Sequence, residues 1–278
     1  MSRLIYPNFS TAVVDDPPVE NIDPRQSWFS YKDADPIIKT HATHWLMCIE
    51  TYQTNRFDSI GNWSIDYSDI ETCIYTYKQS AIIGFRGTKS PKDLYDDILI
   101  IQGKIFPRAM QAIKFVKELV KLNPRVTFQL TGHSLGGAIA RAVSKQLFLE
   151  AITFNAAAPP SNPVTQAPGE TAYHIVFDII SAWQSPNTIR IDKGIQPVST
   201  PWLTTISSYV WMFRIFDSII PAHALKNFSN GTPGKKSTPC AENKLLNQWL
   251  LSLPLSGRLY ILSHLNGPFS ISLPSLVV

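Results

Sequence analysis

The sequence predicts an α/β fold in which a mostly parallel central sheet is flanked by helices. Residues 125–145, RVTFQLTGHSLGGAIARAVSK, have the pattern of a strand, a sharp turn and a helix. A further strand is expected over Ile152–Asn155, and the order strand, helix, strand implies a right-handed parallel crossover. The chain has 278 residues, of which 44% are hydrophobic, so it can bury one large core.

The turn within residues 125–145 has the form G-x-S-x-G, with Ser134 at its centre. β-forming residues precede the turn, and residues 135–149 contain good helix formers and no proline. In such a turn the serine backbone is strained and its hydroxyl is exposed above the sheet, so Gly132 and Gly136 fit the need for neighbours without side chains. The small residues that follow allow the helix to lie close to the sheet and to direct its positive end at the serine.

The segments upstream of this turn alternate between extended and helical patterns. Residues 1–35 contain four prolines and no sustained periodicity, which predicts an extended N-terminal arm. Ile37–Tyr52 has apolar residues along one helical face, and Arg108–Leu122 is amphipathic. Ile65–Tyr77 and Ala81–Phe85 are expected to be two strands joined by a short polar turn.

Downstream of the turn, Ala172–Ile180 is expected to be a strand. Trp202–Ile220 is apolar and aromatic but contains two charged residues, and Asn243–Leu253 has a helical pattern before an apolar tail. We therefore expect residues 36–278 to form a single domain with an apolar C-terminal extension.

The charge and composition of the chain exclude several classes of protein. The net charge is +4 and the basic residues are dispersed, so a nucleic-acid interface is not expected. Charged residues make up 17% of the chain, below the roughly 25% usual for globular proteins, and some exposed surface should be apolar. The N-terminus lacks the apolar core of a secretory signal, which predicts an intracellular protein. No apolar run reaches the roughly 20 residues of a spanning helix.

At residues 131–138, TGHSLGGA, the chain resembles the class 3 lipase family of α/β-hydrolases. A second match lies in Ile82–Thr88, which ends in the F-R-G-T of that family. The segment Asp93–Ile98 is similar to its D-W-x-x-D-L motif, with Leu94 in place of the tryptophan. The resemblance implies an α/β-hydrolase fold with Ser134 as the nucleophile.

The same resemblance implies an oxyanion hole and locates the region of a lid. Backbone N–H groups of Leu135 and Thr88 are expected to bind the oxyanion. The family places its lid within residues 89–107, where this chain has a short isoleucine-rich stretch. Residues 104–108 lack the histidine and glycine of the family's V-H-x-G-F segment, which predicts a small or absent lid.

A serine nucleophile needs a histidine base, and the base needs a carboxylate that orients it. In α/β-hydrolases the acid follows the serine in the chain. Asp178 lies near the carboxyl end of a predicted strand, where the family has an N-D-x-V-P-type turn, although the proline is missing here. Asp192 is the second candidate, and Asp217 is disfavoured because it lies within an apolar segment.

For the base, the preferred residue is His223. It begins the segment HALKNF, which resembles the H-x-x-x-Y/F site of the family. His264 is the alternative, and His174 is disfavoured because it precedes the acid in the chain. His133 belongs to the serine turn itself and is not expected to act as a second base.

These residues predict a serine hydrolase that cleaves carboxylic esters of lipids, such as triacylglycerols or phospholipids, through an acyl-serine intermediate. The expected partner is a lipid or acyl-ester substrate, and the reaction needs no metal or cofactor. The alternative is a catalytically silent protein of the same fold with a structural or assembly role. Contacts with a membrane, or with an assembly through the N-terminal arm or the apolar C-terminus, are compatible with either function.

Overall fold

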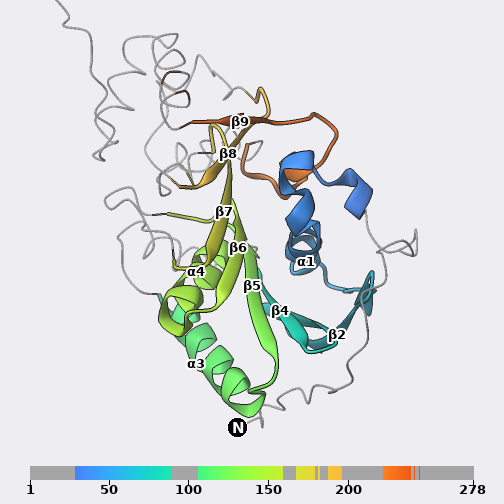
Figure 1. The fold of residues 1–278 in the computed structure, drawn as a ribbon, viewed down its shortest axis with the longest axis vertical. Coiled ribbons are helices and arrows are strands. Elements are labelled where there is room, and N and C mark those ends of the chain that lie inside the picture. The colour runs from blue at the N-terminus through green and yellow to red at the C-terminus, as the bar shows by residue number, and fades with distance from the viewer. Residues whose placement is uncertain are drawn as a thin grey trace, which may run out of the picture.

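In the part of the chain that the structure describes, nine strands form one sheet, and helices cover both of its faces (Figure 1). The computed structural model describes residues 29–88, 106–158, 167–178, 181, 187–195, 222–238, 241 and 244. The strands are β1 (Ser59–Ile60), β2 (Trp63–Ser68), β3 (Thr72–Tyr77), β4 (Ser80–Phe85), β5 (Thr127–His133), β6 (Glu150–Phe154), β7 (Glu170–Ile175), β8 (Ile189–Asp192) and β9 (Lys235–Ser237). They lie side by side in the order of the chain.

The strands from β4 to β8 are parallel, and the strands at both edges of the sheet pair antiparallel. The parallel part joins β4, β5 and β6 through helices, as expected from crossover connections. The predicted α/β-hydrolase fold, with its parallel central sheet and flanking helices, is therefore confirmed.

The prediction of one strand over Ile65–Tyr77 is wrong, because a turn separates β2 from β3. The side chain of Asp69 makes this turn: its Oδ1 accepts hydrogen bonds from the backbone N–H groups of Glu71 and Thr72, each at 2.7 Å. Aspartate stabilises turns in this way, but β-forming residues on both sides hide the break in the pattern. β3 and β4 then form the expected hairpin, with Tyr77 opposite Ser80.

One face of the sheet is covered by α1 (Ala42–Glu50), which follows the 3-10 helix η2 (Pro36–His41). The predicted helix over Ile37–Tyr52 thus begins as a 3-10 helix, and Asp35 caps it by accepting a hydrogen bond from the N–H of Ile37. The apolar face of these helices packs against strand residues in a buried core: Ile38, Trp45, Met47 and Cys48 with Tyr75, Ile82, Phe154 and Tyr173.

The opposite face of the sheet is covered by α3 (Pro107–Leu122) and α4 (Leu135–Leu147), which pack against each other (Figure 1). Their apolar residues form a second core with the strands: Val116, Leu119, Ile139 and Val143 with Ile83, Phe85, Phe128 and Leu130. The helices predicted from residues 108 and 135 are confirmed. Three layers therefore fix the position of the turn between β5 and α4.

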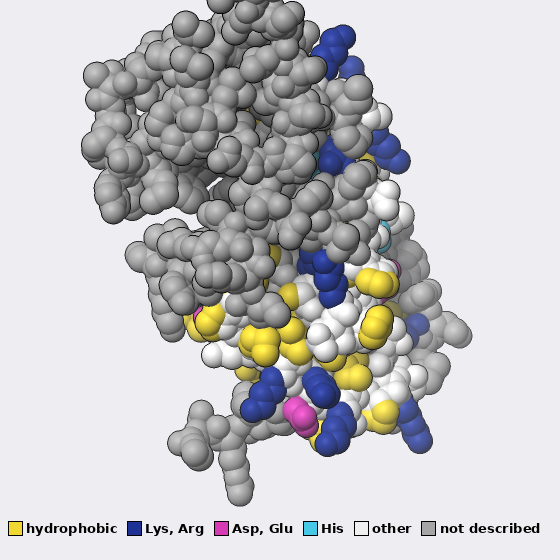
Figure 2. All heavy atoms as spheres, turned by 90° about the vertical axis from the view of Figure 1, so that its left-hand side faces the viewer, with side chains coloured by type: hydrophobic (Ala, Val, Ile, Leu, Met, Phe, Trp, Pro, Cys, Tyr) yellow, Lys and Arg dark blue, Asp and Glu magenta, His cyan; other side chains and the backbone are white. Residues whose placement is uncertain are grey.

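On the α3 and α4 side of the molecule, apolar side chains alternate with lysine and arginine side chains (Figure 2). The large apolar residues exposed in the described part of the chain are Ile70, Met110, Leu122 and Phe148. As the low charge content of the chain predicts, some of the exposed side chains in the described part of the chain are therefore apolar.

Several predictions concern residues outside the described part of the chain. They include the extended arm over residues 1–28, the lid region over residues 89–105, the apolar segment Trp202–Ile220 and most of the C-terminal extension. The division into an arm and one domain therefore stays a prediction. None of the helices that the structure describes is both long and apolar enough to traverse a bilayer.

Candidate active site

Ser134 lies in the tight turn between β5 and α4, with φ 57° and ψ −126°. A non-glycine residue at positive φ costs about 1 to 3 kcal/mol, so the surrounding contacts must hold it. Backbone contacts supply this restraint: the N–H of Ser134 donates to Phe154 O, and its own carbonyl accepts from Ala138 and Ala157. The strained serine predicted from G-x-S-x-G is present, but the predicted exposure is wrong, because Ser134 is buried with 8% of its surface accessible.

The glycines of the turn are needed because other backbone segments pass through the space of their side chains. A Cβ on Gly132 would lie 2.2 Å from Gly136 O, and a Cβ on Gly136 would lie 2.1 Å from Phe85 O. Real Cβ contacts essentially never fall below 3.0 Å. The turn can therefore close only with glycine at both positions, and it presses α4 against the end of β4.

The loop after β4 passes beside Ser134. A Cβ on Gly87 would lie 3.2 Å from the Cβ of Ser134 and 2.7 Å from His133 O. Thr88 follows in this loop, and Leu135 begins α4 directly after the serine. Of the two residues expected to form the oxyanion hole, Leu135 is next to the serine in the chain. Thr88 follows Gly87, which lies beside the serine in space.

Asp178 is fully buried just after β7, in a turn where its N–H donates to Ile175 O at 3.0 Å. The preceding residue, Phe177, has φ 71° and so adopts a left-handed conformation that the sequence pattern does not reveal. Burial alone would raise the pKa of Asp178. The charge and hydrogen bond of His223 outweigh it, with help from His174 and Ser181, and lower the pKa.

The imidazole of His223 is held by Asp178 on one side only. Its Nδ1 lies 2.8 Å from Asp178 Oδ2, while its buried Nε2 has no hydrogen-bond partner among the described residues. The carboxylate therefore fixes the tautomer with the proton on Nδ1, which leaves the lone pair of Nε2 able to accept a proton.

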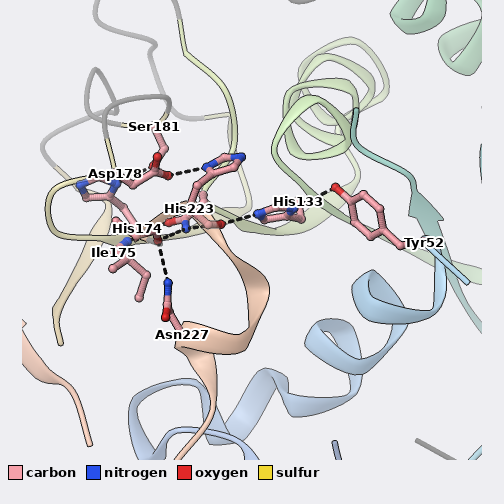
Figure 3. Close-up of polar contacts among 10 residues, drawn as sticks. Tyr52, His133, His174, Ile175, Asp178, Ser181, His223 and Asn227 are labelled. Carbon is pink, nitrogen blue, oxygen red and sulfur yellow. Dashed lines mark hydrogen bonds and ion pairs between the residues drawn. The ribbon is translucent and has the colours of Figure 1, made fainter. Parts of the chain in front are cut away.

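The backbone of His223 is also attached to the serine turn. Its carbonyl accepts hydrogen bonds from Asn155 Nδ2 at 3.0 Å and from His133 Nε2 at 2.8 Å (Figure 3). The His133 and His223 rings lie 4.7 Å apart between centroids. Because His133 immediately precedes Ser134, these contacts place the histidine beside the turn that carries the serine.

The carbonyl of His223 determines which nitrogen of His133 carries the proton, because a carbonyl oxygen only accepts hydrogen bonds. Burial, followed by the nearby charge of His223, lowers the pKa of His133 to about 3, so the ring is neutral. Since Nε2 donates to His223 O, Nδ1 must accept a hydrogen bond from the hydroxyl of Tyr52, at 2.9 Å (Figure 3). The neutral ring of His133 thus links Tyr52 to the backbone of His223, and the expectation that it is not a second base stays a prediction.

Residues 222–238, which we call the base segment, contain His223, the 3-10 helix η4 (Leu225–Phe228) and β9. Trp45 in α1 donates from Nε1 to Leu225 O at 3.0 Å. Lys193 and Asp35 form a buried ion pair, and Lys193 also donates to the backbone carbonyl of Ser229 at 2.9 Å. Contacts with Trp45 and Lys193, which are distant in the chain, therefore hold the segment that contains His223 in place.

The structure brings Asp178 and His223 together and places them beside the turn of Ser134. The second candidate acid, Asp192, accepts a hydrogen bond from the N–H of Gly194 at 2.7 Å and ends β8. His264 and Asp217 lie outside the described residues. In the described part of the chain, no group of three or more His, Cys, Asp or Glu side chains is arranged to hold a metal ion.

Four polar residues near the site were not predicted from the sequence as parts of it: Tyr52, Asn155, His174 and Ser181. Asn155 and Ser181 carry no local signal, because their partners are distant in the chain or depend on the turn after β7. The sequence order disfavours His174 because it precedes Asp178, although the structure links its side chain to Asp178 through Ser181.

Three solved lipase structures are similar to this chain. A triacylglycerol lipase from Penicillium expansum is 19% identical, with 54% of this chain and 77% of that chain covered and a TM-score of 0.34. The Rhizomucor miehei triacylglyceride lipase is 14% identical, with 58% and 81% covered and a TM-score of 0.35. A fungal lipase–inhibitor complex is 15% identical, with 45% and 64% covered and a TM-score of 0.34, so the match spans less than two thirds of that lipase.

No curated protein matches the chain in sequence. A family model described as phospholipase-like, a Tle-like phospholipase domain, matches residues 51–192, which is just over half of the chain. This range contains the hairpin β3–β4, the serine turn and Asp178. The resemblance predicted from the motifs is confirmed at the level of a lipase-like family, and the chain belongs to the family of Tle-like phospholipase domains.

Proposed function

We propose that this protein is a serine hydrolase that cleaves carboxylic esters of lipids through an acyl-serine intermediate. One observation carries the proposal. The imidazole of His223 is held at Nδ1 by the buried carboxylate of Asp178, its Nε2 has no partner among the described residues, and its carbonyl is bonded to the residue before Ser134. A base oriented in this way beside a strained serine is the arrangement that nucleophilic acyl transfer needs.

In the proposed reaction, Ser134 Oγ attacks the ester carbonyl carbon while its proton moves to His223 Nε2. The C–O bond then breaks, and Nε2 returns the proton to the leaving alcohol. A water molecule then gives a proton to the same Nε2 and attacks the acyl carbon. The bond from that carbon to Ser134 Oγ breaks, Nε2 returns the proton to Oγ, and the carboxylic acid is released. Asp178 stabilises the imidazolium that forms at each step, and the N–H groups of Leu135 and Thr88 stabilise the oxyanion.

For the substrate, membership of a phospholipase-like family favours a glycerophospholipid. Triacylglycerols and simple acyl esters are the other substrates compatible with the same chemistry. All of them present an uncharged ester carbonyl, which requires only the serine, the base and the oxyanion donors.

The test uses the Ser134→Ala variant with two measurements, labelling by a fluorophosphonate probe and hydrolysis of phosphatidylcholine and triolein. We expect the wild type to be labelled and to hydrolyse phosphatidylcholine faster than triolein. The variant should show no labelling and a loss in kcat of about 10³-fold or more. The matched control is Ser64→Ala, which removes an exposed serine on β2 and should change neither measurement.

Two outcomes contradict the proposal. If the folded wild type neither reacts with the probe nor hydrolyses any of these esters, the catalytically silent alternative is favoured. If Ser134→Ala retains wild-type turnover, the nucleophile is another residue.

A further inference from the structure

The carboxylate of Asp178 has a second side-chain partner besides His223. Ser181 Oγ donates a hydrogen bond to Asp178 Oδ2 at 2.5 Å, and this is the same oxygen that contacts His223 Nδ1 (Figure 3). Ser181 and Asp178 are both fully buried. A buried carboxylate is stabilised by such charge-assisted hydrogen bonds, which are stronger than neutral ones.

The hydroxyl of Ser181 is in turn bonded to an imidazole. His174 Nδ1 lies 2.6 Å from Ser181 Oγ, and His174 is fully buried on β7. A serine hydroxyl has one proton, and Ser181 uses it to donate to Asp178. The Nδ1–H group of His174 must therefore donate to the serine oxygen. The side chains of His174, Ser181 and Asp178 thus form a row in which each hydrogen bond points toward the carboxylate.

The row is attached to a rigid part of the sheet. His174 lies opposite Arg190 in the parallel pairing of β7 with β8. The next residue, Ile175, donates its N–H to Asn155 Oδ1 at 2.8 Å, and Asn155 Nδ2 donates to the carbonyl of His223. Strand β7 therefore holds His223 in two ways. Its side chain is held through the row that begins at His174, and its backbone is held through Asn155 and Ile175.

We propose that Ser181 and His174 are positioning residues that hold the carboxylate of Asp178 toward His223, with the row His174 → Ser181 → Asp178 acting as one unit. This inference rests on the proposed hydrolase function for its kinetic consequence. Without the Ser181 donor, the carboxylate loses one of the hydrogen bonds that hold its orientation, and the Nδ1–H of His223 then faces a less firmly placed acceptor. Ser181 contributes the bond, and His174 contributes the orientation of the hydroxyl.

The kinetic test compares Ser181→Ala, His174→Leu and His174→Asn. We expect Ser181→Ala to lower kcat about tenfold, the effect of losing one hydrogen bond to a charged group, with KM within about twofold. His174→Leu should lower kcat by a smaller factor, because it removes the neutral bond that orients the hydroxyl. An asparagine amide can occupy the place of Nδ1–H, so His174→Asn should recover most of the activity lost in His174→Leu. In the double variant Ser181→Ala/His174→Leu, kcat should fall no further than in Ser181→Ala, because the second residue acts through the first.

The control variant is Thr188→Val, which removes a buried hydroxyl that has no hydrogen-bond partner among the described residues. Its kcat should equal that of the wild type. Equal kcat in Ser181→Ala and the wild type would overturn the proposal for both residues. Equal losses in His174→Leu and His174→Asn would overturn the part that concerns His174.

A measurement independent of turnover separates this proposal from the proposed function. The proton between His223 Nδ1 and Asp178 should give a downfield resonance in the proton NMR spectrum, assigned by its loss in His223→Gln. We expect Ser181→Ala to shift or broaden this resonance and Thr188→Val to leave it in place. If the wild type hydrolyses no ester, the hydrolase proposal fails, but a shifted resonance still supports the positioning role. An unmoved resonance in Ser181→Ala rejects that role whatever the activity.

Discussion

At the scale of single residues, the site depends on positions where the backbone leaves no room for a side chain. Ser134 keeps its positive φ because Gly132 and Gly136 allow β5, α4 and the end of β4 to approach one another closely. The atoms that a side chain would meet there are backbone atoms, which cannot turn aside as a flexible side chain can. The geometry around the serine is therefore sensitive to a single methyl group.

Replacing Gly136 by alanine should destabilise the protein by about 3 kcal/mol or more, because the new Cβ would lie 2.1 Å from Phe85 O. The measurement is the free energy of unfolding in urea. Gly231→Ala is the matched control, since its Cβ would meet only Ser229 Oγ, at 3.7 Å, and should change the stability by less than about 0.5 kcal/mol. A tolerated Gly136→Ala would mean that β4 and α4 can separate without loss of the fold.

At the scale of elements, the base segment holds its place through contacts with residues from distant parts of the chain. Lys193 follows β8, and Asp35 precedes η2; both are buried, and the N–H of Gly234 donates to Asp35 Oδ2 at 2.9 Å. One ion pair therefore joins the start of the described chain, the edge of the sheet and the segment that carries His223.

The Lys193→Met variant should lose about 3 to 5 kcal/mol of stability, because it leaves the charge of Asp35 buried without its partner. Urea unfolding measures this loss, and the rate of fluorophosphonate labelling should fall in the same variant as the base segment loosens. Lys226→Met removes an exposed lysine from η4 and serves as the control, with an expected change below about 0.5 kcal/mol. If Lys193→Met is destabilised but is still labelled at the wild-type rate, the base segment is held mainly by its other contacts.

At the scale of the whole molecule, the features that could be predicted from the sequence are marked by neighbouring residues or by the order of residues along the chain. The serine turn is local, since its glycines and small residues occupy consecutive positions. The order after Ser134 narrows the candidates for the acid and the base, and the predicted strand end and the family-like segments favour Asp178 and His223. Their hydrogen bond agrees with that choice, although their roles stay predictions. The contact of Ser181 with Asp178 depends on a left-handed residue, Phe177, that no pattern marks.

Contacts between distant residues could not be predicted from one sequence. The Asp35–Lys193 ion pair and the hydrogen bond from Tyr52 to His133 join residues that no periodicity connects. The break between β2 and β3 escaped detection for another reason, because Asp69 makes a turn within a run of β-forming residues. Tertiary geometry decides the two distant contacts, and it exists only after the sheet has formed, whereas the Asp69 turn is local and is masked by its neighbours.

Stability should fall in acid because histidines are buried in neutral form. Burial, and then the charge of His41, lower the pKa of His44 from 6.5 to about 3, although a hydrogen bond with Gln129 opposes the shift. Above pH 6.5 the residue is neutral in both states. Between pH 6.5 and 3 the unfolded chain takes up a proton that the folded protein does not, so the unfolding free energy falls by about 1.4 kcal/mol per pH unit.

Urea titrations between pH 4 and 8 measure this slope. In His44→Leu the slope near pH 5 should be smaller by about 1.4 kcal/mol per pH unit, whereas Ser64→Ala should keep the wild-type slope. His133 contributes in the same direction and remains in both variants. An unchanged slope in His44→Leu would assign the acid sensitivity to other groups.

The strand order β1 to β9 matches the order of synthesis, so each new strand meets a partner that has already left the ribosome. The sheet can thus grow by addition at one edge, without threading a late strand between earlier ones. Ser134 emerges before Asp178, and His223 comes shortly before β9, the last strand of the described chain. A nascent chain halted before that point would hold the serine turn without the histidine that we propose as its base, and we expect it to stay unreactive toward a fluorophosphonate probe.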